Sequence, residues 1–386
     1  MVREQVEALL TGAVKLNDHH IADLVQEDGG AVSPATVRRL RRQLQLPPKR
    51  RRRPPQHRRR RERAGRRGEL VLIDGSPFRW FDEAAVGCSL LGAIDDATGE
   101  ILALTFRPTE DLHGYVVLLH QLLTRHGVPL AFYGDRSGVL VRSDAHWTVE
   151  EQLAGRQRPP QFGRMLEELA VRFIAATSPQ AKGRIERLWG TLQDRLASEL
   201  RLRGHRTVAA ATAYLPHFIQ RHNRRRAQPP AQRDAAFRAL PRDLERVLAC
   251  RYLRVVARDN TVSIPGRWAQ VPPGPYRRSW HAARVEVREL LDGRLLVLHP
   301  RHGLIAEQAA PPGPFVLQAR DGPRARRARV ENPAATPARP TAVPTPTRRR
   351  SSGLGTVTQI RRPAATHPWK RYTGPEPLRP KARAEG

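Results

Sequence analysis

The chain has 386 residues, and its 68 Lys and Arg against 37 Asp and Glu give a formal net charge of +31. At the usual domain size of about 150 residues, this length predicts two or three folded units. No apolar run approaches the ~18 residues of a membrane span, the N-terminus lacks a signal-peptide core, and two cysteines cannot form a disulfide framework. We therefore expect a cytoplasmic protein without membrane contact, whose basic charge indicates a polyanion, most commonly nucleic acid, as partner.

Residues 1–46 are predicted to form a helix-turn-helix segment that reads DNA. A first apolar helical pattern ends at two glycines, and Ser33 followed by Pro34 is then a favourable start for a second helix. Helix, short Gly turn and basic helix is the order of DNA-reading helix-turn-helix units. A plain helical hairpin with a solvated basic face fits the same pattern. In the first interpretation the DNA-binding side chains are Arg38, Arg39, Arg41 and Arg42.

Two basic, Pro-rich segments hold most of the excess charge, because residues 49–67 carry a net +11 and residues 311–386 a net +12. Like charges and prolines prevent either segment from forming a core. We expect a flexible, phosphate-binding linker over 47–68. A disordered basic tail is expected over 311–386, since it has too few apolar residues to offset the entropy of ordering.

The composition changes at residue 69 to apolar strands and helices in the order three strands, helix, strand, helix, strand, helix. This order predicts an α/β domain over 69–205 with a ribonuclease-H-like core and a mixed five-stranded sheet. A doubly wound nucleotide-binding fold is disfavoured, because three consecutive strands come first and no Gly-rich loop follows the first of them. A helical extension over 206–250 and a small β-barrel over 251–310 are expected to follow.

Three acidic residues stand where such a fold can bring carboxylates together. Asp74 follows the first apolar strand, Asp135 follows the fourth, and Glu186 lies in the first turns of the helix after the fifth. The first and fourth strands are neighbours in a ribonuclease-H-like sheet, so the two aspartates are expected to converge. A single Asp at a strand end is more often a turn residue, so only the set of three favours a catalytic function.

Carboxylates in this number suit phosphodiester chemistry. Two Mg²⁺ ions about 3.5–4 Å apart can activate the nucleophile and stabilise the leaving oxygen, and Mg²⁺ prefers oxygen ligands while keeping several waters. We expect Asp74 to bridge both ions, Asp135 and Glu186 each to complete one site, and Mn²⁺ to replace Mg²⁺.

Several motifs resemble those of a known family. They are GELVLIDGS ending at Ser76, IDDATG at 94–99, QFG at 161–163 and SPQAKGRIERLWGTLQDRL at 178–196. The last is long and specific, and together they resemble transposases of the ISNCY family of bacterial insertion sequences, within the wider group of DDE transposases and retroviral-type integrases. The resemblance implies a ribonuclease-H-like catalytic core, Mg²⁺-dependent cleavage and transfer of DNA strands, and a catalytic triad. The triad would be Asp74, Asp135 and Glu186.

The resemblance also implies the partners. Double-stranded DNA would be bound both as the element's terminal inverted repeats and as target, by a homodimer or higher multimer associated with the bacterial nucleoid. Five further basic residues are expected to bind DNA phosphates, with solvated helix charges as the alternative. They are Lys182, Arg184, Arg187, Arg224 and Arg225.

The sequence departs from the family pattern in two places. Relatives begin with an additional helix-turn-helix unit, so this chain is expected to be N-terminally short. The second acid usually stands in a Ser-Asp-Lys context, whereas here it is Gly134-Asp135-Arg136. Two alternatives remain: a truncated or catalytically inactive DNA-binding protein derived from a transposase, and a ribonuclease-H-type nuclease acting on hybrids. The basic linker and the helix-turn-helix pattern disfavour the second.

Overall fold

The computed structural model describes residues 1–50, 62–81, 87–142, 147–176, 183–275 and 277–318. The chain divides into two units, residues 1–323 and 324–386, and every described residue lies in the first. Within the described ranges, no helix combines the length and the apolar character needed to cross a bilayer. The predicted basic tail falls outside the described residues from position 319 onward.

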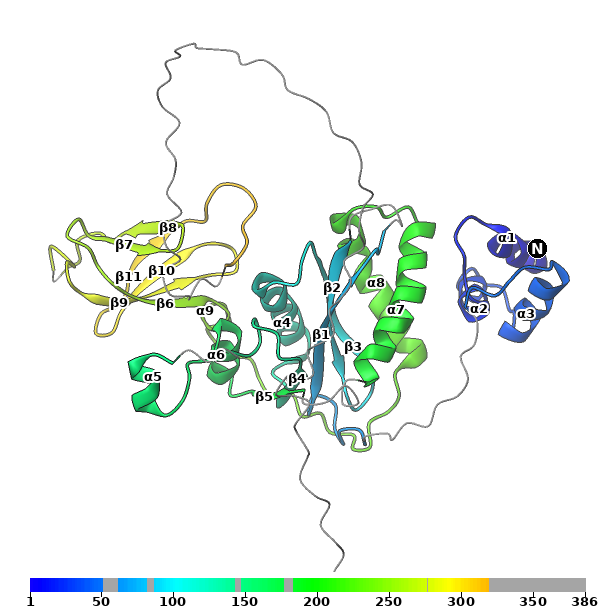
Figure 1. Ribbon diagram of the computed structural model, residues 1–386, viewed down its shortest axis with the longest axis horizontal. Coiled ribbons are helices and arrows are strands. Elements are labelled where there is room, and N and C mark those ends of the chain that lie inside the picture. Colours follow the sequence, from blue (N-terminus) through cyan, green and yellow to red (C-terminus); the bar gives the residue numbers. More distant parts are fainter. Residues whose placement is uncertain (51–61, 82–86, 143–146, 177–182, 276, 319–386) are drawn as a thin grey trace, which may run out of the picture. The chain divides into compact units, whose positions relative to one another are not determined.

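A mixed five-stranded sheet forms the centre of the fold (Figure 1). β1 to β3 form an antiparallel meander, β4 and β5 run parallel to β1, and the order across the sheet is β3-β2-β1-β4-β5. The predicted α/β architecture is therefore confirmed, including the neighbouring first and fourth strands. The strands are β1 (Val71–Phe78), β2 (Cys88–Asp95), β3 (Ile101–Arg107), β4 (Ala131–Gly134) and β5 (Arg172–Ala175).

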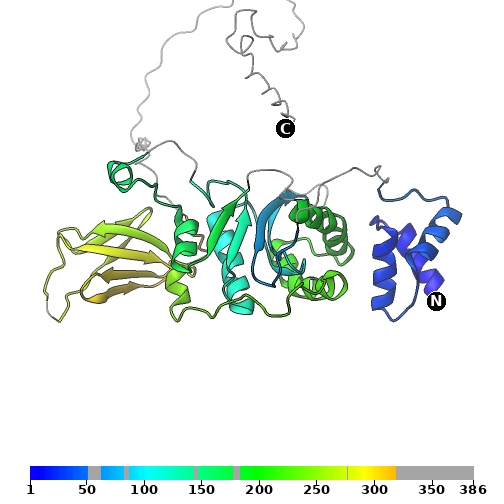
Figure 2. The same ribbon diagram turned by 90° about the horizontal axis from the view of Figure 1, so that it is seen from below.

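Helices cover both faces of this sheet (Figures 1 and 2). One face packs against α4 (Leu112–His126) and α6 (Gln161–Glu168), which follows the short α5 (Val149–Ala154). The other packs against α7 (Gly183–Leu202) and α8 (Val208–Arg226). Side chains alternate along a strand, so Ile73 joins the apolar cluster beneath α4 while Leu72 joins the one beneath α7 and α8.

Three helices form the N-terminal segment: α1 (Val2–Thr11), α2 (Asp18–Glu27) and α3 (Pro34–Gln43). As the sequence predicts, Ser33 caps α3, because its side chain accepts a hydrogen bond from the backbone N of Thr36 at 3.1 Å. DNA reading by this segment stays a prediction. The segment has an apolar cluster of its own, whose buried members are Val6, Leu16, Ile21, Ala22, Leu24, Val25, Val37 and Leu40.

The predicted linker over 47–68 contacts the core at both of its described ends. Lys49 donates from Nζ to the backbone oxygen of Asp194 at 2.7 Å. Arg67 forms an ion pair with Glu100 at 2.5 Å. Each of these ends therefore finds a specific acceptor on the core. Residues 51–61 between them lie outside the described residues, so the flexible linker stays a prediction.

An antiparallel four-stranded sheet, in the order β11-β10-β9-β6, and a separate hairpin of β7 and β8 follow the short helix α9 (Leu244–Val247). The predicted strands are present, while their closure into a barrel stays a prediction. The expected helical extension is interrupted, because residues 227–243 contain no helix. The strands are β6 (Cys250–Val255), β7 (Thr261–Ile264), β8 (Arg267–Gln270), β9 (Arg284–Glu289), β10 (Leu295–His299) and β11 (Gly303–Gln308).

Candidate functional site

The carboxylate of Asp74 is half-buried and contacts α7. Trp189 donates a hydrogen bond from Nε1 to Oδ2 of Asp74 at 3.0 Å. Two residues further along β1, Gln193 donates from Nε2 to Oγ of Ser76 at 3.1 Å. Strand β1 continues to Phe78, so Asp74 lies within the strand rather than at its end. Helix α7 therefore fixes both the position of this part of β1 and the orientation of the Asp74 carboxylate.

Asp135 follows β4 directly, and its Oδ1 accepts a hydrogen bond from the backbone N of Ser137 at 2.9 Å. Strand β4 pairs with β1 in parallel, with Tyr133 opposite Leu72. Asp135 is the first residue after the end of β4, and a continuation of this register would place it opposite Asp74. The parallel pairing of β1 with β4 thus brings side by side the chain segments that carry the first two predicted acids.

A third carboxylate near these aspartates, that of Glu110, was not among the predicted site residues. Tyr115 donates from its hydroxyl to Oε1 of Glu110 at 2.6 Å. Burial, and then the negative charges of Glu110, Asp135 and Asp74, raise the pKa of the Tyr115 phenol. All three carboxylates therefore lie within electrostatic range of one hydroxyl.

The glycine at position 75 is the sequence feature that relates to Glu110, because its lack of a side chain makes space for the Glu110 carboxylate. A Cβ atom at position 75 would lie 2.8 Å from Cδ of Glu110 and 3.1 Å from Cδ2 of Leu91, so a side chain there would displace that carboxylate from the place it occupies. The glycine beside Asp74 thus reflects close packing against a second acid.

Glu186 lies in the first turn of α7, and its side chain is exposed. Its neighbours Ile185, Leu188 and Trp189 are buried and hold the helix on the sheet. Among the described residues, no group of three His, Cys, Asp or Glu side chains could hold a metal ion. Within its described residues, the structure therefore does not gather all three predicted ligands into one metal-binding group. Lys182 lies outside the described residues.

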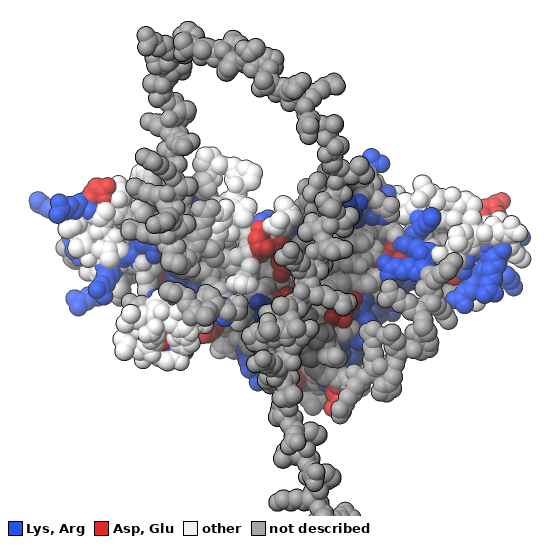
Figure 3. All heavy atoms as spheres, in the orientation of Figure 1, with Lys and Arg blue, Asp and Glu red and all other residues white. Residues whose placement is uncertain are grey.

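The four arginines predicted on α3 fall into two kinds. Arg41 is only 8% exposed; it donates from Nε to Asp18 at 2.9 Å and from Nη1 to the backbone oxygen of Leu46 at 3.0 Å. Arg38 also pairs with Asp18, at 3.4 Å. Arg39 and Arg42 are exposed. In Figure 3, Lys and Arg side chains gather over this N-terminal part of the chain. We therefore confine the interpretation of α3 as a DNA-binding helix to Arg39 and Arg42.

Of the two arginines in the first turns of α7, one pairs with a buried acidic residue and the other is exposed. Arg184 forms an ion pair with Asp96, whose side chain is fully buried. Asp96 also accepts a hydrogen bond from the backbone N of Ala64 at 2.9 Å. The Asp96 carboxylate therefore stabilises a structural turn, and Arg184 contributes to that turn through its ion pair with Asp96. Arg187 lies on the same helix, and its side chain is exposed to solvent.

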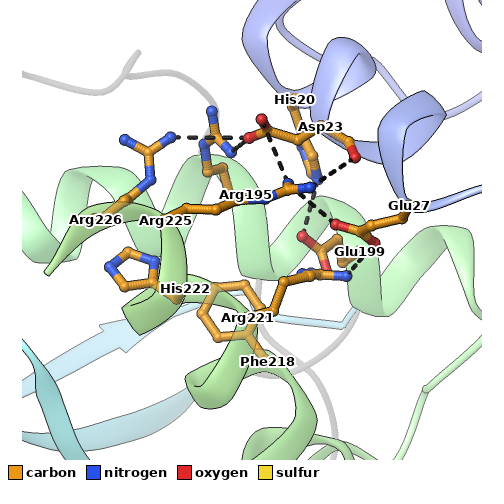
Figure 4. Close-up of a pocket in the computed structure, with 10 residues that line it drawn as sticks. All are labelled: His20, Asp23, Glu27, Arg195, Glu199, Phe218, Arg221, His222, Arg225 and Arg226. Atoms are coloured by element: carbon orange, nitrogen blue, oxygen red, sulfur yellow. Dashed lines mark hydrogen bonds and ion pairs between the residues drawn. The ribbon is translucent and has the colours of Figure 1, made fainter. Parts of the chain in front are cut away.

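Helix α2 contacts the end of α8 through acidic side chains, as Figure 4 shows. Arg225 forms ion pairs with Asp23 at 3.4 Å and with Glu27 at 3.1 Å. Burial, and then the positive charges of Arg226 and Arg195, lower the pKa of His222 to about 4, so its imidazole is neutral at pH 7. Of the two residues predicted to bind DNA here, Arg224 is exposed while Arg225 is paired with α2.

A buried carboxylate, Glu199, joins α2 to α7 and α8 beneath these ion pairs (Figure 4). His20 approaches its Oε1 with Nε2 at 2.9 Å, the Tyr214 hydroxyl donates to its Oε2 at 2.7 Å, and Arg221 pairs with the same oxygen. Burial opposes ionisation of this carboxyl, but these hydrogen bonds and charges prevail and lower the pKa of Glu199 to about 2. Nothing in the local sequence around His20 indicates this contact.

No protein-family profile matches the chain. It is 40% identical over 240 residues to y4bF of Sinorhizobium fredii (strain NBRC 101917 / NGR234), named as a transposase, covering 61% of this chain and 51% of that protein. It is 36% identical over 156 residues to the transposase for insertion sequence IS1202 of Streptococcus pneumoniae, covering 40% of this chain and 32% of that protein.

These relatives confirm the resemblance to insertion-sequence transposases that the motifs predicted. The chain spans about half the length of the first relative, at 51%, and about a third of the second, at 32%.

Two solved structures match parts of the chain at low similarity. The HTLV-2 integrase catalytic core domain in complex with magnesium, in its dimeric form, matches with a TM-score of 0.28 and 14% identity, over 39% of this chain and 85% of that one. A simian T-cell lymphotropic virus intasome matches with a TM-score of 0.29 and 14% identity, over 74% and 91%. Values this low carry no argument about function.

Proposed function

We propose that this chain is a DNA transposase, with a ribonuclease-H-like core that cleaves phosphodiester bonds at the ends of an insertion sequence and transfers the freed strand to target DNA. Sequence similarity to two proteins named as transposases supports the proposal. The single observation that carries it is the parallel pairing of β1 with β4, whose register, continued past Gly134, would place Asp135 opposite Asp74.

In this proposal Asp74 and Asp135 hold divalent cations, with Glu186 as the further ligand. The donor set fits Mg²⁺, which binds hard oxygen ligands and is commonly held through one or two carboxylates, with water and substrate phosphate as its other ligands. When bound, Mg²⁺ supplies charge neutralisation and water activation at the phosphodiester. Mn²⁺ is expected to serve as well.

The chain's own residues orient the ligands and the substrate. Trp189 fixes the Asp74 carboxylate through its 3.0 Å hydrogen bond, so this oxygen donor is already oriented before DNA arrives. The exposed Arg187 on α7 would bind a phosphate near Asp74. Exposed Arg39, Arg42 and Arg224 would bind the DNA backbone further away, where each cation adds affinity without sequence preference.

The reaction consists of two displacements at phosphorus. Water attacks the phosphodiester at the element end, its oxygen forms the new P–O bond, and the 3′-oxygen leaves and takes up a proton. The 3′-hydroxyl so produced then attacks a target phosphodiester: its oxygen forms the new P–O bond, and the target's 3′-oxygen leaves and takes up the proton that the hydroxyl gives up. Two element ends must be joined together, so a multimer of at least two chains is expected on the terminal repeats and target DNA.

A cleavage assay tests this proposal. Purified protein is incubated with labelled duplexes taken from the DNA flanking its coding sequence, with Mg²⁺, Mn²⁺ or EDTA. We expect metal-dependent nicks that Asp74→Asn, Asp135→Asn and Glu186→Gln each abolish. Asp234→Asn is the matched control, because this side chain is 69% exposed and lies outside the proposed site. Nicks that persist in the three site variants would overturn the assignment.

A second candidate function is binding of DNA without catalysis. The exposed position of Glu186, together with the lack of a three-ligand metal group among the described residues, favours this candidate. It predicts that the parent protein binds the same duplexes equally with metal or EDTA and makes no nicks. The cleavage assay therefore separates the two functions.

A further inference from the structure

We propose that four arginines on α7 and α8 form a binding surface for the phosphate backbone of duplex DNA, and that helix α2 covers this surface, so that α2 and DNA compete for the same guanidinium groups. We call this surface the arginine face. It rests on the proposed function, because it assigns a DNA-binding surface to the same protein. Its members are Arg195, Arg221, Arg225 and Arg226.

Two carboxylates of α2, one helical turn apart, meet the arginine face (Figure 4). Asp23 pairs with Arg195, with Arg225 at 3.4 Å and with Arg226 at 3.9 Å. Glu27 pairs with Arg221 at 2.7 Å and with Arg225 at 3.1 Å. The carboxylates of α2 therefore occupy the positions from which DNA phosphates would pair with the same arginines.

The charges at this contact do not cancel. Four arginines face Asp23, Glu27 and the buried Glu199, so one positive charge remains in excess, and the exposed Arg224 adjoins the group. Burial and the neighbouring positive charge of Arg195 lower the pKa of Arg226, with Arg225 acting in the same direction. The cluster thus favours a partner with more negative charge than α2 carries, which a phosphate backbone provides.

The contact can open without unfolding either side. The apolar cluster of α1 to α3 draws all its members from residues 2–40, and the cluster beneath α7 and α8 draws none from that segment. The contacts from α2 to α7 and α8 are polar, among them the side-chain pairs of Asn17 with Asp194 and of His20 with Glu199. Polar contacts of this kind weaken with salt and with a competing polyanion.

Arg221 behaves differently from the other members of the face. It pairs with Glu199 as well as with Glu27, and Glu199 belongs to α7, so Arg221 keeps an anionic partner after α2 departs. Arg195, Arg225 and Arg226 are paired with residues of α2. Opening therefore releases three guanidinium groups for phosphates.

The test removes the acidic competitor without changing side-chain shape. Binding of a labelled random-sequence duplex is measured by fluorescence anisotropy for the parent and for Asp23→Asn/Glu27→Gln over a salt series. We expect the variant to bind on the order of tenfold more tightly at low salt. Its log Kd should depend on log salt with a slope steeper by about 3, one phosphate contact for each released arginine. Adding Arg225→Gln and Arg226→Gln should return binding to the parent level.

Glu4→Gln/Glu7→Gln on α1 is the matched control, because it makes the same change in net charge away from the arginine face. A gain equal to that of the α2 variant would show a general charge effect and overturn the proposal. In the parent protein, hydrogen exchange of the α2 amides should accelerate when duplex is added, and unchanged protection of α2 in the DNA complex would also overturn it.

Asp74→Asn separates this proposal from the proposed function. It should lose nicking and keep the competition between α2 and DNA. Conversely, a parent protein that never nicks but shows the tighter binding of Asp23→Asn/Glu27→Gln would contradict the proposed function and leave the arginine face supported.

Discussion

Trp189 donates a 3.0 Å hydrogen bond to Asp74, joining α7 to β1 across 115 positions of sequence. The same indole packs against β2, where a Cβ on Gly92 would lie 2.8 Å from Cη2 of Trp189. One side chain therefore sets both the distance of α7 from the sheet and the orientation of a proposed metal ligand.

Trp189→Phe should reduce nicking by about tenfold, because the ring still packs but Asp74 loses the donor that orients it. The loss of one hydrogen bond should lower the free energy of unfolding by about 1 kcal/mol. Single-turnover cleavage and urea titration measure the two effects. Trp80→Phe is the control, since Trp80 donates to the backbone oxygen of Ser76 at 3.2 Å and should lose stability alone. Equal loss of cleavage in both variants would contradict a specific orientation of Asp74.

Gly75→Ala should destabilise the protein by about 1–3 kcal/mol, because its Cβ overlaps the Glu110 carboxylate in a packed site. Gly190→Ala on α7 meets nothing within 4 Å of its Cβ. That second variant should be neutral or stabilising by about 0.5–1 kcal/mol, since alanine is the better helix former. Urea unfolding curves check both, and a neutral Gly75→Ala would contradict a fixed position of the Glu110 carboxylate.

Acid should weaken the protein through Glu199. Its folded pKa of about 2 lies below its ordinary value of 4.5, so its stabilisation is complete above about pH 4.5 and is lost as the pH falls through 2. The contribution is on the order of 3 kcal/mol. Glu199→Gln should lower stability at pH 6 and flatten this part of the pH profile. Glu245→Gln, 72% exposed, is the control that should retain the parent profile. Parallel profiles for parent and Glu199→Gln would refute the interpretation.

The sequence predicts those features that depend on local pattern. Apolar runs define the strands, Ser33 and Pro34 define the start of α3, and the order of elements implies that β1 and β4 are neighbours, so the approach of Asp74 and Asp135 follows from topology. Glu110 was missed because its relation to Asp74 depends on a glycine that admits it against the strand.

The sequence does not predict which arginines are free to bind DNA and which are paired within the protein. Arg41 and Arg225 are equivalent by composition to Arg42 and Arg224 beside them, but in the folded chain Arg41 pairs with Asp18 and Arg225 pairs with Asp23. With 68 basic residues, pairing depends on which helices meet, and no local pattern records that. The meeting of His20 with Glu199, 179 positions apart, is of the same kind.

Binding of Mn²⁺ tests most directly whether Asp74 and Asp135 form a divalent-cation site. Electron paramagnetic resonance of the free ion gives the affinity for the parent protein, Asp74→Asn and Asp135→Asn without DNA or catalysis. We expect the parent to bind Mn²⁺ and each variant to lose at least tenfold in affinity, while Asp234→Asn binds as the parent does. Equal affinity in the parent and both site variants would contradict the account.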